Sequence, residues 1–306
     1  MSNLDYQFDS KRVANWKSHL TTEGFVVINN VLDSNQVQSG LASFIEQFGS
    51  ATFDGFIDDP AFVYSDFVWS CRTNPEVLKI YQQLYNLEST KQLLTAIDRG
   101  TAIPNVLSAD PDEAAAYWLH VDYPLLDVKL KNNENEIPPI YQSFLSFVDS
   151  GGSNRPGLRV VPRSATTANH ERILRDNDDD GAEPTYWLLS QDHNDDLESE
   201  VVEVVSPAGS LTLWLSGLIH DNTTAVIDLG NSILPLARLV IYLCYAPRSW
   251  ATAEELQLRE KMYKRGQITT HWPVKYLSLH DDGSRRWAWR QMANRYSIIS
   301  SLIPLA

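Results

Sequence analysis

The sequence predicts a mainly β fold: a double-stranded β-helix (jelly roll) core with flanking helices. Many short apolar runs in the middle of the chain are separated by Gly and Pro, as in double-sheet proteins. Helical spacing of apolar residues occurs before and after these runs. The 306 residues are enough for one domain, so we expect a single domain over 1–306 with its core at about 92–246.

The predicted strands of the core are short and rich in β-branched and aromatic residues. They are Gln92–Asp98, Tyr117–Asp122, Ile140–Asp149, Gly157–Val161, Val201–Val205, Ser210–Trp214 with a continuation to His220, and Leu239–Tyr245. In a jelly roll, residues from separate strands converge at one mouth. Side chains that are far apart in the sequence can therefore form one site.

The segments outside the core predict an N-terminal helical brace and a C-terminal extension. Asp33 or Ser34 can cap the helix over Gln36–Phe48, where apolar residues follow helical spacing. The other expected elements are helices over Lys11–Leu20, Glu76–Ser89 and Thr252–Arg265, and a short β run over Gly24–Asn29.

The most informative segment is Trp118-Leu-His-Val-Asp-Tyr123, with His220 about 100 residues later. His120 and Asp122 alternate with Val121, so on a strand both side chains leave the same face. Two imidazoles and one carboxylate are typical of non-haem Fe(II) oxygenases, because three coordination positions stay open for a co-substrate and O2. Taken alone, His-x-Asp more often marks a half-buried histidine bonded to its aspartate.

The order of later segments strengthens the metal interpretation. Gly157-Leu-Arg-Val-Val161 leads to Pro162-Arg-Ser-Ala165, a turn and strand over Pro207–Trp214 precede His220, and Arg238 opens a β-like stretch that ends at Arg248. From roughly Thr22 to Pro273 the chain resembles the phytanoyl-CoA dioxygenase-like branch of the Fe(II)/2-oxoglutarate oxygenases. Arg163-Ser-Ala165 and Asp221 depart from that pattern, and neither removes a ligand.

The resemblance implies Fe(II), 2-oxoglutarate and O2 as cofactor and co-substrates. His120, Asp122 and His220 match the metal ligands, and Arg238 matches the arginine that pairs with the far carboxylate of 2-oxoglutarate. An arginine fork suits a carboxylate better than a lysine does. Arg248 is the rival for this role, and Ser232 is a possible hydroxyl partner of Arg238.

Further pocket residues are predicted near these groups. Gln142 or Ser143 could bind the near carboxylate of 2-oxoglutarate, and alternation along their strand does not decide which one faces inward. The candidates for binding the substrate are Asp98, Arg99, Trp118 and Tyr123, and each could equally be structural. His271, beside Trp272, could contact the active site, but a packed turn is the favoured interpretation.

The implied activity is that of a dioxygenase that hydroxylates or otherwise oxidises a small molecule, with release of succinate and CO2. The retained Asp122 argues against halogenation, which in this superfamily goes with loss of the carboxylate. Two alternatives remain: a cupin-like metal-dependent dioxygenase that does not use 2-oxoglutarate, and a non-catalytic jelly-roll binding protein.

The composition of the chain disfavours several classes of binding partner. A formal net charge of −14 disfavours binding to nucleic acid or an anionic membrane surface, although a local arginine can still bind a small anion. The two cysteines form no disulfide framework and no zinc cluster. No signal-peptide pattern and no apolar run of membrane length occur, so we expect a cytoplasmic protein with a small-molecule substrate. The oligomeric state does not follow from the sequence.

Overall fold

Two β-sheets form the centre of the computed structural model, which describes residues 5–49, 55–104, 119–122, 140–152, 155–177, 186–223, 236–269 and 271–274. The large sheet has the strand order β1 (Gln7–Asp9), β2 (Phe25–Asn29), β11 (Leu211–Leu215), β7 (Tyr141–Ser146), β13 (Leu236–Pro247), β5 (Gly100–Pro104) and β3 (Gly55–Ile57), with β4 (Leu93–Thr95) also paired to β13. The small sheet has the order β10 (Val202–Glu203), β8 (Leu158–Val160), β12 (His220–Asn222), β6 (His120–Asp122) and β9 (Tyr186–Leu188). Apart from the parallel pair β1–β2, neighbouring strands are antiparallel.

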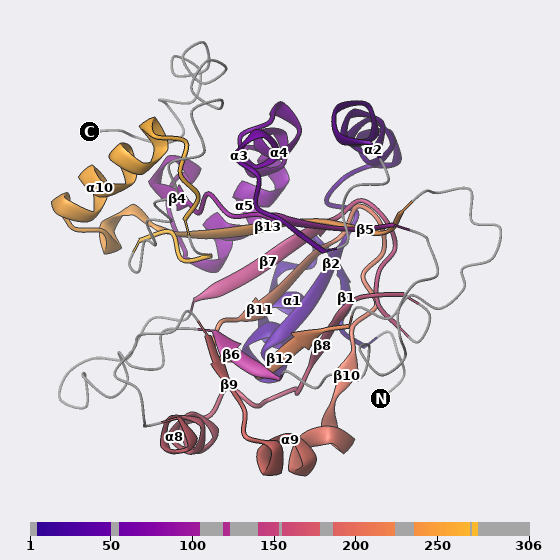
Figure 1. Cartoon of the computed structure of the whole chain (residues 1–306), viewed down its shortest axis with the longest axis vertical. Helices are drawn as coiled ribbons and strands as arrows, with labels where there is room; N and C mark the ends of the chain where they lie inside the picture. Colours follow the sequence, from indigo (N-terminus) through magenta and orange to yellow (C-terminus); the bar gives the residue numbers. More distant parts are fainter. Residues whose placement is uncertain are drawn as a thin grey trace.

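The inner faces of the two sheets share one apolar cluster. Buried side chains from β2, β7, β11 and β13 of the large sheet pack there with side chains from β8 of the small sheet, namely Phe25, Val27, Phe144, Trp214, Val240, Leu158 and Val160. Figure 1 shows the strands of the small sheet below those of the large sheet. Burial of these faces holds the sheets together, because apolar area removed from water stabilises by about 25 cal/mol per Å².

Helices from the first 84 residues cover the outer face of the large sheet. They are α1 (Val13–Glu23), α2 (Ser34–Phe48), α3 (Pro60–Val63), α4 (Asp66–Arg72) and α5 (Pro75–Leu84), and their apolar side chains pack with strand residues such as Leu213 and Leu239. Gly24, with a φ of 87°, ends α1 and turns the chain into β2, a conformation that glycine adopts without steric cost. Asp33 begins α2 with a capping box that includes Gln36.

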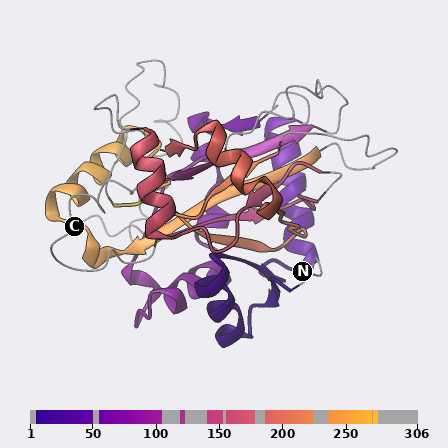
Figure 2. The ribbon, with the colours of Figure 1, turned by 90° about the horizontal axis from the view of Figure 1, so that it is seen from below.

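Two further helices pack on the small sheet and a third lies at the end of the large one. Ile173 and Leu174 of α8 (Thr167–Asp176) pack with Val121 of β6 and Trp187 of β9, and α9 (Gln191–Leu197) contributes Leu197. In Figure 2, α8 and α9 lie in front of the sheets. Leu256 of α10 (Ala253–Lys264) packs near Leu94 and Ala246. Short 3-10 turns occupy Thr90–Gln92, Glu198–Glu200 and Arg248–Trp250.

The structure confirms the predicted helices as α1, α2, α5 and α10, and most of the predicted core strands. Two predicted strands differ. Gln92–Asp98 is reduced to β4, and the expected continuous strand from Ser210 to His220 is two strands, β11 and β12, which belong to different sheets. The sheets also extend beyond the predicted core, because β1, β2 and β3 all precede residue 92. Within the described residues, no helix is both long and apolar enough to cross a membrane.

Phe62 tests the packing of the helices on the large sheet. Its side chain is fully buried, and its ring centroid lies 5.4 Å from that of Phe48 and 6.0 Å from that of Phe44. We expect Phe62→Ala to lower the free energy of unfolding by about 3–5 kcal/mol, because it leaves a cavity in the core. Leu188→Ala, at a side chain that is 43% exposed, should change it by about 0.5 kcal/mol or less. Urea denaturation of both variants measures the difference, and equal losses would contradict this account of the core.

Candidate active site

His120, Asp122 and His220 come together on the inner side of the small sheet. β6 and β12 are antiparallel neighbours, and His220 lies directly opposite His120. Directly paired residues project from the same face of a sheet, and Asp122, two residues after His120, projects from that face too. All three residues are buried, and one possible ligand atom from each lies within 4.8 Å of the others.

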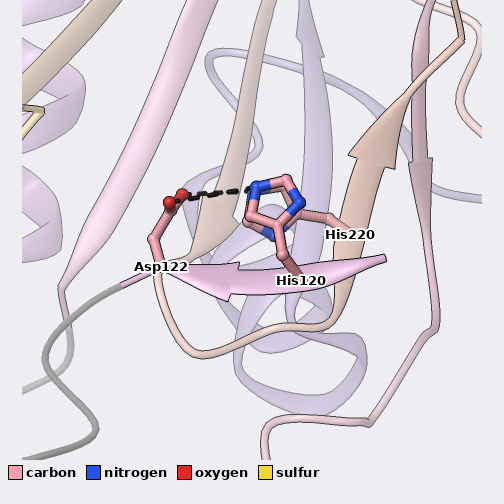
Figure 3. A group of neighbouring side chains, drawn as sticks. All are labelled: His120, Asp122 and His220. Carbon is pink, nitrogen blue, oxygen red and sulfur yellow. Dashed lines mark ion pairs between the residues drawn. The ribbon is translucent and has the colours of Figure 1, made fainter. Parts of the chain in front are cut away.

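The geometry within the group matches a set of ligands around one ion. The Nε2 atoms of His220 and His120 lie 3.2 Å and 3.9 Å from the two carboxylate oxygens of Asp122, and the imidazole centroids are 4.4 Å apart. Figure 3 shows the Asp122 carboxylate directed toward the two rings. Neutral imidazole nitrogens and a carboxylate in this arrangement can bind a divalent first-row metal.

A hydrogen bond to the backbone fixes the orientation of the His220 ring. Its Nδ1 lies 2.7 Å from the carbonyl oxygen of Leu218, to which it can donate a hydrogen bond. This bond directs Nε2 toward Asp122 and the shared centre, where Nε2 donates to Asp122 while it is protonated and can bind a metal once it has lost the proton. A second ring nitrogen that donates to a backbone carbonyl is a common device for holding a metal-binding histidine.

The loop that carries Leu218 is itself braced. The hydroxyl of Ser164 accepts a hydrogen bond from the backbone N–H of Ile219 at 2.8 Å, and Nε2 of His170 lies 2.7 Å from the carbonyl oxygen of Gly217. A Cβ at Gly217 would lie 2.8 Å from the His170 ring, so glycine permits the close approach of α8. Ser164 belongs to the run after Pro162 that carried the family resemblance, and this contact is its structural role.

Asp122 is held as a carboxylate. Nε2 of Gln142 donates to Asp122 at 2.8 Å and to the hydroxyl of Ser216 at 3.0 Å. Burial opposes ionisation, but the charges of His271, His220 and His120 and a hydrogen bond from His220 hold the pKa of Asp122 well below its usual range. For His220, burial disfavours the charged form, yet the hydrogen bond and charge of Asp122 raise its pKa above the ordinary value.

These contacts also decide between Gln142 and Ser143. Gln142 faces the site, where it donates to Asp122. Ser143 faces away from it: its hydroxyl donates to the carbonyl oxygen of Leu243 in β13 and accepts a hydrogen bond of 3.0 Å from the hydroxyl of Tyr81 in α5. The structure thus places Gln142 on the side of the metal-ligand candidates, bonded to Asp122. Its predicted contact with 2-oxoglutarate stays a prediction.

Asp221, the residue after His220, forms a buried ion pair. Arg159 of β8 binds both of its carboxylate oxygens, with distances of 2.8 Å and 2.5 Å. The two residues are direct partners in the pairing of β12 with β8. The departure from the family pattern at Asp221 therefore has a structural consequence, because the pair locks the strand that carries His220.

Arg238 lies in the interior and not at a surface strand end. It is 1% exposed, its Nη2 donates to Oδ1 of Asn222 at 2.8 Å, and its guanidinium carbon lies 5.5 Å from the centroid of the Phe144 ring. Burial lowers the pKa of Arg238, an effect opposed by Tyr242. Arg248 is half-buried in the turn at the other end of β13.

Arg238 differs from the other two arginines that are buried in the described chain. Arg72 and Arg259 each donate to two backbone carbonyl oxygens. Arg238 instead donates to one side-chain amide oxygen, and no carboxylate among the described residues forms an ion pair with it. Its Nε, like those of Arg72 and Arg259, has no hydrogen-bond partner among the described residues. A buried cation with unused donors is suited to bind an anion.

A cavity of about 510 Å³ opens onto the three metal-ligand candidates. Its wall includes Gln142, Asn222, Trp214 and Tyr242, and it also includes Arg99, whose side chain is 45% exposed. Arg238 reaches this wall through its bond to Asn222. The predicted site residues Trp118, Tyr123 and Ser232 lie outside the described residues.

The cavity wall also includes Asp98, His271, Tyr186 and Phe56, which come from four separate segments. Asp98 and His271 are possible pocket residues from the sequence, whereas no pattern in the sequence predicts Tyr186 or Phe56. Tyr186 and Phe56 lie on three-residue strands, which are too short for a periodic signal.

The sequence matches no family model and no curated protein. A hypothetical protein, JW0805 from Escherichia coli, matches in structure with a TM-score of 0.54 at 14% identity, over 88% of this chain and 78% of that one. The epimerase SnoN, solved in complex with Fe3+, alpha ketoglutarate and nogalamycin RO, matches with a TM-score of 0.50 at 14% identity, over 78% of this chain and 84% of SnoN. These likenesses establish a shared fold.

The buried pair Arg159–Asp221 should be important for stability. Arg159→Ala leaves the Asp221 carboxylate buried without its cation, so we expect a loss of about 3 kcal/mol or more in the free energy of unfolding. Arg172→Ala is the matched control, because its pair with Asp196 is exposed at the surface and should be worth about 1 kcal/mol or less. Equal losses in the two variants, measured by urea denaturation, would show that the buried pair does not lock β12.

Metal affinity should depend on pH through His220. A metal must displace the proton from Nε2, and Asp122 raises the pKa of this imidazole above the usual value of 6.5. Affinity for Fe(II) should therefore be greatest above the raised pKa and fall as the pH drops through it. Anaerobic Fe(II) titrations between about pH 8 and 6 measure this, with the ordinary imidazole range as reference. A constant affinity over that range would contradict the assignment of His220 as a ligand.

Proposed function

We propose that this protein is a non-haem Fe(II)- and 2-oxoglutarate-dependent dioxygenase that oxidises a small molecule, with release of succinate and CO2. The observation that carries the proposal is the convergence of His120, Asp122 and His220 within 4.8 Å on one sheet face, beside a cavity. We further propose that the two sheets form a jelly roll within a single domain, and that the phytanoyl-CoA dioxygenase-like branch is its nearest family.

The residues present fit the proposed ion. Two imidazoles and one carboxylate leave half of an octahedral coordination sphere open, which is the arrangement used by Fe(II) enzymes that also bind a co-substrate and O2. His220 presents Nε2 because Nδ1 is directed to Leu218, and Asp122 is ionised. When bound, Fe(II) would activate O2, which is the oxidant, and 2-oxoglutarate would supply two of the four electrons that the reduction of O2 needs.

The residues present also fit the co-substrate. Arg238 supplies a buried guanidinium whose Nε has no partner among the described residues. The far carboxylate of 2-oxoglutarate would pair with it, and Asn222 already orients one of its nitrogens. The ring of Phe144 lies beside the guanidinium and keeps this end of the site apolar.

The protein's own part in the reaction is to position groups and to exclude water. Gln142 donates a hydrogen bond to Oδ2 of Asp122, the oxygen that also lies 3.2 Å from Nε2 of His220, and this contact fixes the orientation of the carboxylate. Trp214 lies 5.6 Å from the His220 ring, between centroids, and packs in the cluster between the sheets. These contacts give the site one geometry before any ligand arrives, which is the main contribution a protein makes to metal chemistry.

SnoN was solved with Fe3+ and alpha ketoglutarate, and its fold is shared by this chain. We propose that this protein binds the same two ligands, with iron held by His120, Asp122 and His220. The far carboxylate of 2-oxoglutarate would pair with Arg238. We also propose a small-molecule substrate and a cytoplasmic location, to which two free, buried cysteines are suited.

Anaerobic absorption spectroscopy tests this function. With Fe(II) and 2-oxoglutarate the protein should develop a weak visible charge-transfer band. Arg238→Ala should weaken 2-oxoglutarate binding about 100-fold, because it removes charge-assisted hydrogen bonds worth about 1.5–3 kcal/mol each. Arg248→Ala, at the other end of the same strand, is the matched control and should retain the band.

Three outcomes separate the alternatives. Bound iron without a band would favour a cupin-like enzyme that does not use 2-oxoglutarate. No iron binding would favour a non-catalytic binding protein. Unimpaired iron affinity in His120→Ala, Asp122→Ala and His220→Ala alike would refute the ligand assignment.

A further inference from the structure

A second polar group lies on the wall of the same cavity. It consists of Asp98, between β4 and β5, and His271, beyond α10. Asp98 is 6% exposed, and its Oδ1 accepts a hydrogen bond of 2.7 Å from the backbone N–H of Arg99. Its Oδ2 accepts none from the described residues. Nε2 of His271 is buried and likewise has no partner among them.

Two buried arginines fix the backbone on either side of this group. Arg72 of α4 donates to the carbonyl oxygen of Asp98 at 2.5 Å, and Arg259 of α10 donates to that of Pro273 at 2.6 Å. Neither arginine lines the cavity. Main-chain contacts thus position Asp98 and His271. Oδ1 of Asp98 also forms an ion pair with Nε of Arg99 at 3.7 Å, so the atoms that are left for a ligand are Oδ2 of Asp98 and Nε2 of His271.

Backbone hydrogen bonds also join the two segments directly. The N–H of Ile97 donates to the hydroxyl of Thr269 at 2.8 Å, and the N–H of Thr269 donates to the carbonyl oxygen of Ile97 at 2.9 Å. The segments that carry Asp98 and His271 are therefore held side by side. A pair of polar groups so positioned, each with an unused atom, is suited to bind a ligand.

Exposed aromatic side chains lie on the same cavity. Phe56 and Tyr186 are 53% and 45% exposed, and they line it from β3 and β9, the last strands of the large and small sheets. The guanidinium carbon of Arg99 lies 4.7 Å from the centroid of the Phe56 ring, and the Tyr186 ring lies 5.6 Å from the His120 ring. Exposed apolar rings at a cavity commonly contact the apolar part of a ligand.

The charges on the wall disfavour an anion. Asp58 and Asp98 line the cavity with Arg99, while Asp122 would be neutralised by the metal. Burial raises the pKa of Asp98, and the charges of Arg99 and His271 oppose this. A carboxylate oxygen that has no donor is satisfied by a hydroxyl or a protonated amine, and either imidazole tautomer can complete the contact.

We propose that Asp98 and His271 form a substrate subsite that binds a hydrogen-bond-donating group, a hydroxyl or a protonated amine, of a small molecule whose apolar part contacts Phe56 and Tyr186. This inference rests on the proposed function, since it names the substrate chemistry of the same cavity. Asp98 accepts the hydrogen bond from the substrate, and His271 orients the same group.

The test uses three probes with one skeleton: 2-phenylethylamine, 2-phenylethanol and 3-phenylpropionate. Their binding to the full chain loaded with Zn(II) and 2-oxoglutarate is measured by saturation-transfer NMR at neutral pH. The donor probes should bind more tightly than the carboxylate. If the subsite binds an amine, Asp98→Asn should weaken binding of 2-phenylethylamine about tenfold or more, because the negative charge is lost. The same variant should weaken binding of 2-phenylethanol much less, because the asparagine still accepts a hydrogen bond. A hydroxyl subsite predicts that amine and alcohol bind wild type alike.

Variants at His271 and Asp192 distinguish a direct contact with the probe from an indirect effect on the fold or the net charge. His271→Ala should weaken both donor probes, and His271→Gln should restore part of the affinity, because its amide can replace Nε2. Asp192→Asn, on an exposed face of α9, removes the same charge away from the cavity and should change nothing.

Retention of the Fe(II)–2-oxoglutarate charge-transfer band in Asp98→Asn and His271→Ala would show that the co-substrate site is intact. Absence of that band in the wild type counts against the proposed function. The affinities of the three probes would still test the subsite by themselves. The subsite is refuted if 3-phenylpropionate binds as tightly as the donor probes. It is also refuted if neither donor probe binds, or if both bind Asp98→Asn and His271→Ala as they bind wild type.

Discussion

The antiparallel register between β6 and β12 is the constraint on which the candidate active site depends. It places His220 opposite His120, although about 100 residues separate them in the chain. Because side chains alternate between the two faces of a strand, a slip of one residue would turn His220 out of the site. Three contacts hold β12 and the turn before it in place: the Arg159–Asp221 pair, the hydrogen bond from Ile219 to Ser164 and the contact of His170 with Gly217.

The site also needs both sheets. The small sheet supplies His120, Asp122 and His220, whereas Gln142 and Arg238 come from β7 and β13 of the large sheet. Trp214 belongs to the apolar cluster between the sheets and lines the cavity as well. The same packing that stabilises the fold therefore sets the distance between the metal-ligand candidates and Arg238.

The three metal-ligand candidates could be predicted from the sequence, whereas much of the cavity around them could not. His120 and Asp122 could be placed on one face because a strand has a period of two, and the spacing of apolar residues located α2. Every residue of β7 is buried, so alternation could not decide between Gln142 and Ser143. The break between β11 and β12 was missed because apolar residues continue on both sides of the turn.

The sequence around His271 allowed either a packed turn or a contact with the active site and could not decide between them. Its segment is fixed by Arg259, which donates to the carbonyl oxygen of Pro273 from α10, a helix whose sequence is mainly charged. Asp98 depends in the same way on Arg72, which lies 26 residues before it. Contacts between a side chain and a distant backbone carbonyl leave no periodic pattern, and prediction from sequence fails at such places.

The anchoring of the cavity wall by Arg72 and Arg259 separates two properties of the protein. The metal-ligand candidates are held by the small sheet, while the wall that carries Asp98 and His271 is held by helices from opposite ends of the chain. Selection for a new substrate could therefore act on α4, α10 and the segments they hold without altering the metal centre. Such a division would let one catalytic core diversify among substrates through changes that lie outside the sheets.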